Sequence, residues 1–286
     1  MDQRILTLFD EYTHVPLSRR HFLDRLQQLA GSAALAAAAL AVLEPGYARA
    51  ATVQPTSSKL VEENVTWPGT QGVTMQGYLV HPKGRRKRGG VVVIHENRGL
   101  TPHIKDVTRR VAQAGYLALG VDALSVFGGT PADEDKGREL IGKLDKPQTL
   151  AHYLNALAYL RQRPDCNGRT SCVGFCWGGA MANSLATHDP QLNASVAYYG
   201  TQPAAEEAAS IKAHLLLHYA GLDERVNAGK DAWEAALKST NVQYAQYVYE
   251  GVNHAFNNDT SPARYNAEAA KLAWDRTLKL FKEELG

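Results

Sequence analysis

Cysteine is scarce in this chain, with three residues among 286. Three cysteines cannot build the disulfide framework on which small secreted folds depend, so the fold must rest on a buried core. A chain of this length with 44% hydrophobic residues can supply such a core, as one large domain or two small ones. An excess of charge is also missing, because 31 basic and 29 acidic residues give a net charge of +2. This balance gives no strong pull toward nucleic acid.

A long hydrophobic run is absent as well. The Ala-rich stretch over residues 30–43 is too short and too weakly apolar for a comfortable membrane span. It follows Ser18-Arg19-Arg20-His21-Phe22-Leu23 and precedes the small-x-small site Ala48-Arg49-Ala50. This order indicates a twin-arginine signal peptide over residues 1–50, with cleavage after Ala50. We therefore expect export by the twin-arginine translocase to the periplasm or the exterior, with no stable membrane anchor; the alternative is an N-terminal helix that packs and stays attached.

Residues 51–59 are polar and indicate a linker, and residues 60–286 then alternate strand and helix patterns as one domain. Two alternating segments around a Pro-Gly turn predict an antiparallel hairpin. The later strands are continuous apolar runs separated by helical spacing, which is typical of a parallel sheet covered on both faces. The expected strands are 61–67, 73–80, 90–95, 116–121, 170–173, 194–199, 213–219 and 242–249; the expected helices are 104–114, 136–143, 150–160, 180–187, 231–239 and 263–284. The predicted fold class is α/β, with a mostly parallel, doubly wound sheet.

The segment GFCWGG, residues 174–179, organises the rest of the interpretation. It follows an apolar strand and precedes a helix, as the G-x-S-x-G nucleophile elbow of α/β-hydrolases does, with Cys176 in the place of serine. Glycines are needed there because side chains would collide where strand and helix meet. The helix N-terminus favours a thiolate and an oxyanion nearby. The alternative is a small buried cysteine in a glycine-rich turn.

A thiol nucleophile needs a base, and an acid that orients the base. In α/β-hydrolases these follow in the order nucleophile, acid, histidine, each on a loop after a strand. Asp223 follows the strand 213–219, and His254 follows the strand 242–249. They are the predicted acid and base.

Metal and disulfide alternatives are weaker. Cys172 and Cys176 lie four residues apart on a strand, about 13 Å at ~3.3 Å per residue, which is too far to chelate one zinc ion. We therefore predict no metal and no cofactor. Cys166 and Cys172 could face each other across a turn, which leaves a disulfide open.

The chain resembles the dienelactone hydrolase (carboxymethylenebutenolidase) family over residues 58–284, and its exported bacterial branch in particular. The resemblance rests on the segments VVVIHENRG (91–99), GFCWGG (174–179), YYG (198–200) and NHAF (253–256), together with Asp223. It implies that Glu96 holds the resting thiol. It also places the oxyanion hole at the backbone N–H groups of Trp177 and Asn97, in the arrangement usual for this kind of site.

The chain departs from the family at two positions. Where relatives that act on dienelactone carry arginines for the substrate carboxylate, this chain has Val126 and Asn258. Arg98, Lys136 or Arg138 could substitute for those arginines. Arg98 and Tyr199, which belong to the matching segments, are the candidates for substrate binding.

We therefore expect a hydrolase that cleaves a small ester or lactone through a thioester on Cys176. One alternative is a thiol protein that reacts with peroxide. The other is a non-catalytic binding protein that keeps the fold. A complete triad in the correct order counts against the second alternative.

Overall fold

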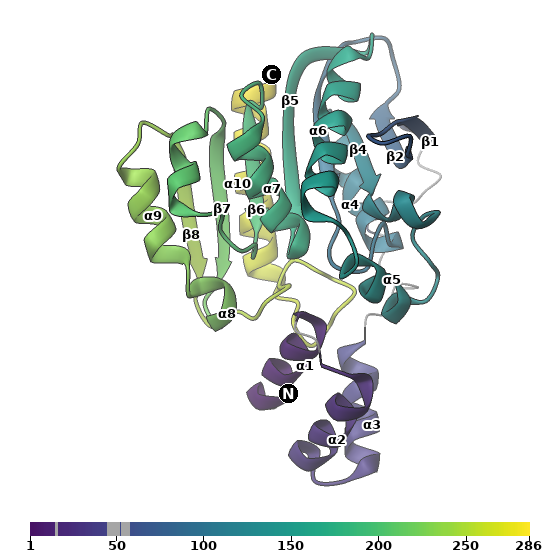
Figure 1. Ribbon diagram of the computed structural model, residues 1–286, viewed down its shortest axis with the longest axis vertical. Helices are drawn as coiled ribbons and strands as arrows, with labels where there is room; N and C mark the ends of the chain where they lie inside the picture. The colour runs from purple at the N-terminus through teal and green to yellow at the C-terminus, as the bar shows by residue number, and fades with distance from the viewer. Residues whose placement is uncertain (15–16, 45–51, 53–57) are drawn as a thin grey trace.

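The computed structural model describes residues 1–14, 17–44, 52 and 58–286. The cleavage site predicted after Ala50 lies outside the described residues, as does most of the predicted linker 51–59. Figure 1 shows an α/β domain built from residues 60–286 and, against one end of it, a unit of three N-terminal helices.

An eight-stranded sheet forms the centre of the α/β domain, in the order β1-β2-β4-β3-β5-β6-β7-β8 (Figure 1). Antiparallel pairing joins β1 to β2 and β2 to β4, and all other neighbours are parallel. The strands are β1 Leu60–Pro68, β2 Thr74–Pro82, β3 Arg88–Ile94, β4 Leu117–Asp122, β5 Cys166–Phe175, β6 Ala194–Tyr198, β7 His214–Ala220 and β8 Tyr244–Tyr249. The predicted hairpin and the mostly parallel sheet are both confirmed.

Helices connect the strands and cover both faces of the sheet (Figure 1). They are α4 Pro102–Gln113, α5 Glu134–Ile141, α6 Lys146–Gln162, α7 Trp177–His188, α8 Glu224–Asn227, α9 Lys230–Lys238 and α10 Ala267–Leu285, with 3-10 turns η2 Ala123–Phe127 and η3 Ala205–Ser210. α6 begins four residues before its predicted start because the Asp145 side chain accepts a hydrogen bond from the Gln148 N–H, and Pro147 suits the first turn. α8 was not predicted, since four residues are too few to show a helical period.

The alternation of side chains along β3 divides the core in two. Val91 and Val93 point into the layer that α4 and α10 cover, with Val107 and Phe281 among its members. Val92 and Ile94 point into the layer beneath α6, α7 and α9. Successive strand residues face opposite sides, so an uninterrupted apolar run fits a strand that is buried on both faces.

The N-terminal unit consists of α1 Gln3–His14, α2 Arg19–Ala30 and α3 Ala33–Leu43. The three helices bury a cluster of their own, which includes Phe9, Phe22 and Leu26. The hydroxyls of Ser18 and Ser32 cap α2 and α3 by accepting backbone N–H bonds. The pair Arg19 and Arg20 thus lies in the first turn of α2.

No single helix in the described part of the chain is long and apolar enough to cross a membrane. The pair α2 and α3 reaches the required length and composition only together, and it is bent by 113°.

Candidate active site

The nucleophile elbow has the strained geometry that the glycines around it predict. Cys176 joins β5 to α7 with φ 58° and ψ −114°, a conformation that L residues seldom adopt. A Cβ on Gly174 would lie 1.8 Å from the Gly178 carbonyl oxygen, and one on Gly178 would lie 2.5 Å from the carbonyl oxygens of Ile94 and His95. Neither position can accept a side chain without moving the backbone. The close approach of neighbouring backbone atoms therefore requires glycine at both positions.

Asp223 and His254 meet where the sequence order places them. Asp223 caps α8, just beyond β7, and its Oδ1 accepts the Val226 N–H at 3.1 Å. Its Oδ2 lies 2.5 Å from Nδ1 of His254, which comes from the loop after β8. Both residues are only 4% exposed. Burial alone would raise the pKa of Asp223, but the neighbouring His254 and these hydrogen bonds outweigh it and lower the pKa.

The bond to Asp223 fixes the tautomer of His254. An ionised carboxylate can only accept, so Nδ1 carries the proton and Nε2 presents a lone pair. Nε2 is buried and has no hydrogen-bond partner in the described part of the chain. A base that is oriented at one nitrogen and vacant at the other is ready to take a proton from a neighbouring nucleophile.

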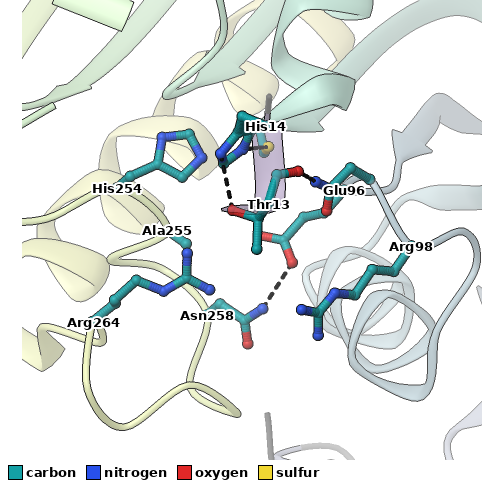
Figure 2. A pocket seen from close by; sticks show the side chains of 10 residues that line it. Thr13, His14, Glu96, Arg98, His254, Ala255, Asn258 and Arg264 are labelled. Atoms are coloured by element: carbon teal, nitrogen blue, oxygen red, sulfur yellow. Dashed lines mark hydrogen bonds between the residues drawn. The ribbon is translucent and has the colours of Figure 1, made fainter. Parts of the chain in front are cut away.

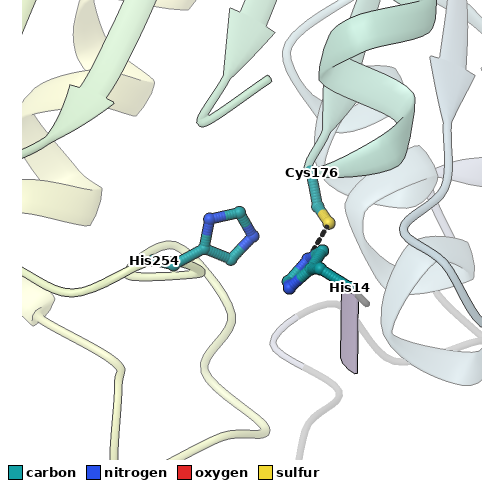
Figure 3. A group of neighbouring side chains, drawn as sticks. All are labelled: His14, Cys176 and His254. Carbon is teal, nitrogen blue, oxygen red and sulfur yellow. Dashed lines mark hydrogen bonds between the residues drawn. The ribbon is translucent and has the colours of Figure 1, made fainter. Parts of the chain in front are cut away.

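An unpredicted residue also contacts the thiol. His14, the last residue of α1, places its Nε2 2.9 Å from the Cys176 Sγ. Figure 3 shows the sulfur next to the His14 ring, with the His254 ring facing both from its own loop. Burial alone would lower the pKa of His14, but the charge of Cys176 and the hydrogen bonds outweigh it and raise the pKa. The sequence predicts a signal peptide over residues 1–50, and that prediction gives His14 no role in the site.

Glu96 lines the same pocket as Cys176 (Figure 2). Its carboxylate accepts a hydrogen bond from the Asn258 side-chain amide at 2.8 Å. The hydrogen bond of the thiol goes to His14, so the resting contact between Glu96 and Cys176 stays a prediction. Asn258, noted in the sequence only because an arginine is absent there, orients Glu96.

The two backbone amides predicted to form an oxyanion hole belong to Trp177 and Asn97. Trp177 is the first residue of α7, and Asn97 lines the pocket. The hydrogen bonds among the described residues leave both backbone amides without an acceptor. The side chain of Asn97 is engaged separately, because its amide donates to the carbonyl oxygen of Thr13 at 2.5 Å.

Of the two residues predicted to bind substrate, one lines the described pocket and the other does not. Arg98 lines the pocket and pairs with Glu134. Tyr199 packs its ring 4.9 Å from that of His254 and is not among the residues that line the described pocket. Arg264, which sequence patterns did not single out, lines the pocket as well (Figure 2). Two arginines therefore line the pocket, one of them paired with Glu134, and the Glu96 carboxylate lines it as well.

The other positions considered for substrate binding lie elsewhere. Val126 belongs to η2 and Lys136 pairs with Glu139, both outside the residues that line the pocket. Arg138 stacks over the Tyr12 ring at 3.9 Å and donates to the Tyr12 carbonyl. The Arg138 side chain is thus engaged in contacts with α1 and does not line the pocket.

The pocket is almost filled in the full chain. Thr13 and His14 form part of its wall, and the remaining cavity of about 20 Å³ holds about one water molecule. An ester substrate needs more room, so α1 must move away or be removed before a substrate can reach Cys176.

The cysteines Cys166, Cys172 and Cys176 are all free and buried. Cys172 Sγ lies 3.3 Å from the Ser195 hydroxyl, and burial raises its pKa to about 12. The disulfide that the sequence left open does not form between Cys166 and Cys172 in this structure.

The fold and the elbow together define the α/β-hydrolase class: a mostly parallel sheet carries Cys176 on a sharp strand-to-helix turn, and Asp223 and His254 follow later strands. Comparison with known proteins specifies the class further. The family model described as "Dienelactone hydrolase family" matches residues 75–285. The chain belongs to this family, whose members are carboxylic ester hydrolases.

Individual relatives agree with the family model. The chain is 31% identical over 253 residues to a protein of Escherichia coli O157:H7 named "Putative carboxymethylenebutenolidase", which covers 82% of this chain and 92% of the relative. A hydrolase fragment of Escherichia coli strain K12 is 51% identical over 106 residues, covering 36% of this chain and 91% of the fragment. The crystal structure of a "Putative Dienelactone Hydrolase" from Klebsiella pneumoniae superposes with a TM-score of 0.70 at 28% identity, covering 78% of this chain and 98% of that one.

Proposed function

We propose that this protein hydrolyses a small ester or lactone through a thioester on Cys176. The observation that carries the proposal is the shared position of three groups. Cys176 stands on the elbow, and His254, bonded to Asp223, presents a vacant Nε2 to the same pocket. This is the arrangement of nucleophile, base and orienting acid that acyl transfer needs.

In the first half of the reaction, His254 takes the thiol proton and the Cys176 sulfur forms a bond to the substrate carbonyl carbon. The carbonyl oxygen becomes an oxyanion and accepts hydrogen bonds from the Trp177 and Asn97 amides. One such donor is typically worth about 3 kcal/mol in the transition state. The carbon–oxygen bond then breaks, and the leaving alkoxide takes the proton from Nε2 of His254.

In the second half, water attacks the thioester carbonyl and gives a proton to His254. The carbon–sulfur bond breaks, the acid product leaves, and the sulfur departs as a thiolate that His254 can protonate again. Asp223 stays ionised throughout, holding the imidazole in one tautomer and stabilising the imidazolium.

Glu96 and the arginines are the proposed accessory residues. We assign Glu96 to a resting contact with the thiol once α1 has left the pocket, with Asn258 orienting its carboxylate. Arg98 and Arg264 face the pocket from opposite sides in Figure 2, and they favour a substrate with negative charge near the reacting carbonyl. Tyr199 supports the ring of His254 in this scheme.

We also propose that residues 1–50 are an export signal of the twin-arginine route. The motif from Ser18 to Leu23, the Ala-rich run and the cleavage site support this proposal. The mature chain would then act in the periplasm or outside the cell, with its partner during export the twin-arginine translocase. Removal of α1 also takes Thr13 and His14 out of the pocket wall.

Kinetics on a panel of short acyl nitrophenyl esters and lactones test the activity, using protein isolated from cells that export it. The variants Cys176→Ala and His254→Ala should each lose at least about 10³-fold in kcat/KM, since both act in one unit. The matched control is Cys172→Ala, a buried thiol outside the site, which should keep activity near that of the wild type. No hydrolysis by the wild type across the panel, or equal losses in all three variants, would contradict the proposal. Consumption of the thiol by peroxide faster than by acyl probes would favour the redox alternative instead.

A further inference from the structure

Two histidines, not one, present a nitrogen to the same sulfur. One ring nitrogen of His14, one of His254 and the Sγ of Cys176 all lie within 4.8 Å of one another. The two rings meet edge to face with centroids 4.6 Å apart (Figure 3). His14 comes from α1 and the other two from the α/β domain, so the cluster exists only while α1 is in place.

In both histidines, oxygen acceptors contact Nδ1, the ring nitrogen that points away from the thiol. Nδ1 of His14 lies 2.8 Å from the Asp10 carbonyl oxygen and 3.1 Å from its carboxylate. Nδ1 of His254 lies 2.5 Å from the Asp223 carboxylate. Acceptors at both Nδ1 atoms place the proton there, so in the neutral rings both Nε2 atoms carry lone pairs. A carboxylate behind a histidine is also the usual outer shell of a metal-bound imidazole.

One thiol proton cannot serve two lone pairs. His14 Nε2 makes the hydrogen bond to Cys176, and His254 Nε2 is left buried without a partner in the described part of the chain. A divalent ion that prefers nitrogen and sulfur would satisfy the two nitrogens and the sulfur together. Two imidazoles and one thiolate form a ligand set that zinc takes, with water in the fourth position.

The spacing requires only a small adjustment. Zinc bonds of about 2.3 Å to sulfur and about 2.0–2.1 Å to nitrogen in a tetrahedron put nitrogen and sulfur about 3.5 Å apart. The 2.9 Å contact between His14 and Cys176 would therefore open by about 0.6 Å. The cavity of about 20 Å³ beside these groups has room for the water ligand.

We propose that the full-length chain holds a zinc-class divalent ion between His14, Cys176 and His254, which ties α1 to the catalytic pocket and masks the thiol. This inference goes beyond the proposed hydrolysis, because the ligand set includes a residue of the N-terminal unit and binding is measured without substrate. Thiolate and both lone pairs would be unavailable for catalysis while the ion is bound. Removal of the ion by a chelator would leave α1 held by its other contacts.

The test titrates the reduced full-length protein, first freed of metal, with Co²⁺ and with Zn²⁺ against a chromophoric chelator. We expect one ion per chain and a thiolate-to-cobalt charge-transfer band in the near ultraviolet. His14→Gln should weaken Zn²⁺ binding by more than about a hundredfold, because loss of an outer-shell partner alone typically costs 10–100-fold. Asp10→Asn should fall in that 10–100-fold range without removing a ligand.

The matched control is His188→Gln, a half-exposed histidine at the end of α7. It should bind Zn²⁺ as the wild type does. Circular dichroism of each variant checks that the helices remain folded. A missing charge-transfer band, or equal Zn²⁺ affinity in His14→Gln and the wild type, would overturn the proposal. Failure of ester hydrolysis would leave the binding result unchanged, and failure of metal binding would leave the hydrolysis result unchanged.

Discussion

Individual residues around Cys176 decide whether the elbow can form. The cysteine tolerates φ 58° because Gly174 and Gly178 let strand, turn and helix approach within van der Waals contact. Its own N–H donates to the Tyr198 carbonyl oxygen at 3.0 Å, which holds the turn against β6. The strain is therefore maintained by surrounding backbone rather than by the side chain.

A methyl group at position 178 should disrupt this arrangement. We expect Gly178→Ala to lower the free energy of unfolding by about 1–3 kcal/mol, because its Cβ would overlap two backbone carbonyl oxygens. Gly142→Ala is the control, since φ there is −65° and the nearest atom lies 3.4 Å away. Urea unfolding of both variants gives the comparison. Equal stability of the two variants would contradict the packing account.

The ionised Asp223 should make stability depend on pH on the acid side. Its pKa in the folded protein is lowered below the ordinary 3.8, so the ionised form favours folding. The stabilisation is complete above the unfolded pKa and is lost as pH falls through the lower folded value. The difference in urea midpoint between wild type and Asp223→Asn should thus be constant above about pH 5 and shrink toward acid. A difference that grows below pH 4 would be the wrong sign.

The order of elements along the chain predicted three site residues. The other residues of the site are brought there by contacts between distant segments. Cys176, Asp223 and His254 each follow a strand, and parallel strands end at one edge, so sequence order was enough to propose them. Arg264 and Asn258 lie in the loop after β8, and no local pattern marks which of its side chains turn inward. His14 could not be predicted for another reason: it lies 162 residues from its partner Cys176 in the sequence, and no pattern links the two.

At the scale of elements, α1 is the segment that fills the pocket beside the thiol. Its tip enters the pocket, and its other contacts include Tyr12 with Arg138 and Asp10 with Arg225. Phe9 anchors it in the N-terminal cluster, 1% exposed, with the Arg264 guanidinium 5.0 Å from its ring centre. Seventeen residues precede Ser18, and most of this length is α1.

Loosening α1 should expose Cys176. Phe9→Ala removes a buried ring, a change that typically costs 3–5 kcal/mol, so α1 should detach more often. We expect the rate of alkylation of Cys176 by iodoacetamide to rise at least about tenfold, because reactivity follows the open fraction. Phe127→Ala, at a half-exposed position, is the control. Cys176→Ser supplies the background from the two other thiols, and equal rates in both phenylalanine variants would contradict a closing role for α1.

At the scale of the whole molecule, the fold of the α/β domain followed from patterns that repeat along the chain. Continuous apolar runs such as 90–95 predicted strands buried on both faces, and the two core layers on β3 confirm it. The short α8 was missed because it rests on one capping side chain, Asp223, rather than on a period. The packing of the N-terminal helices was weighed only as the alternative to a signal peptide, since an Ala-rich run has the same composition in both.

The proposed export concerns the whole chain, and the N-terminus of protein isolated from cells tests it. We expect the exported form to begin at Ala51. The control replaces Arg19 and Arg20 with lysine, which should leave the chain unprocessed if the arginine pair is the signal. An intact Met1 on the wild-type protein outside the cytoplasm would contradict the proposed cleavage.

The most direct test of the central claim is a mass measurement of the acyl-enzyme. Processed protein is mixed with a short acyl nitrophenyl ester, quenched in acid within the first turnover, and weighed intact and after digestion. We expect a gain in mass equal to one acyl group, located on the peptide that carries Cys176 and released by hydroxylamine, and no gain in Cys176→Ala. Turnover with no acyl group on Cys176, or with the group on another residue, would contradict it.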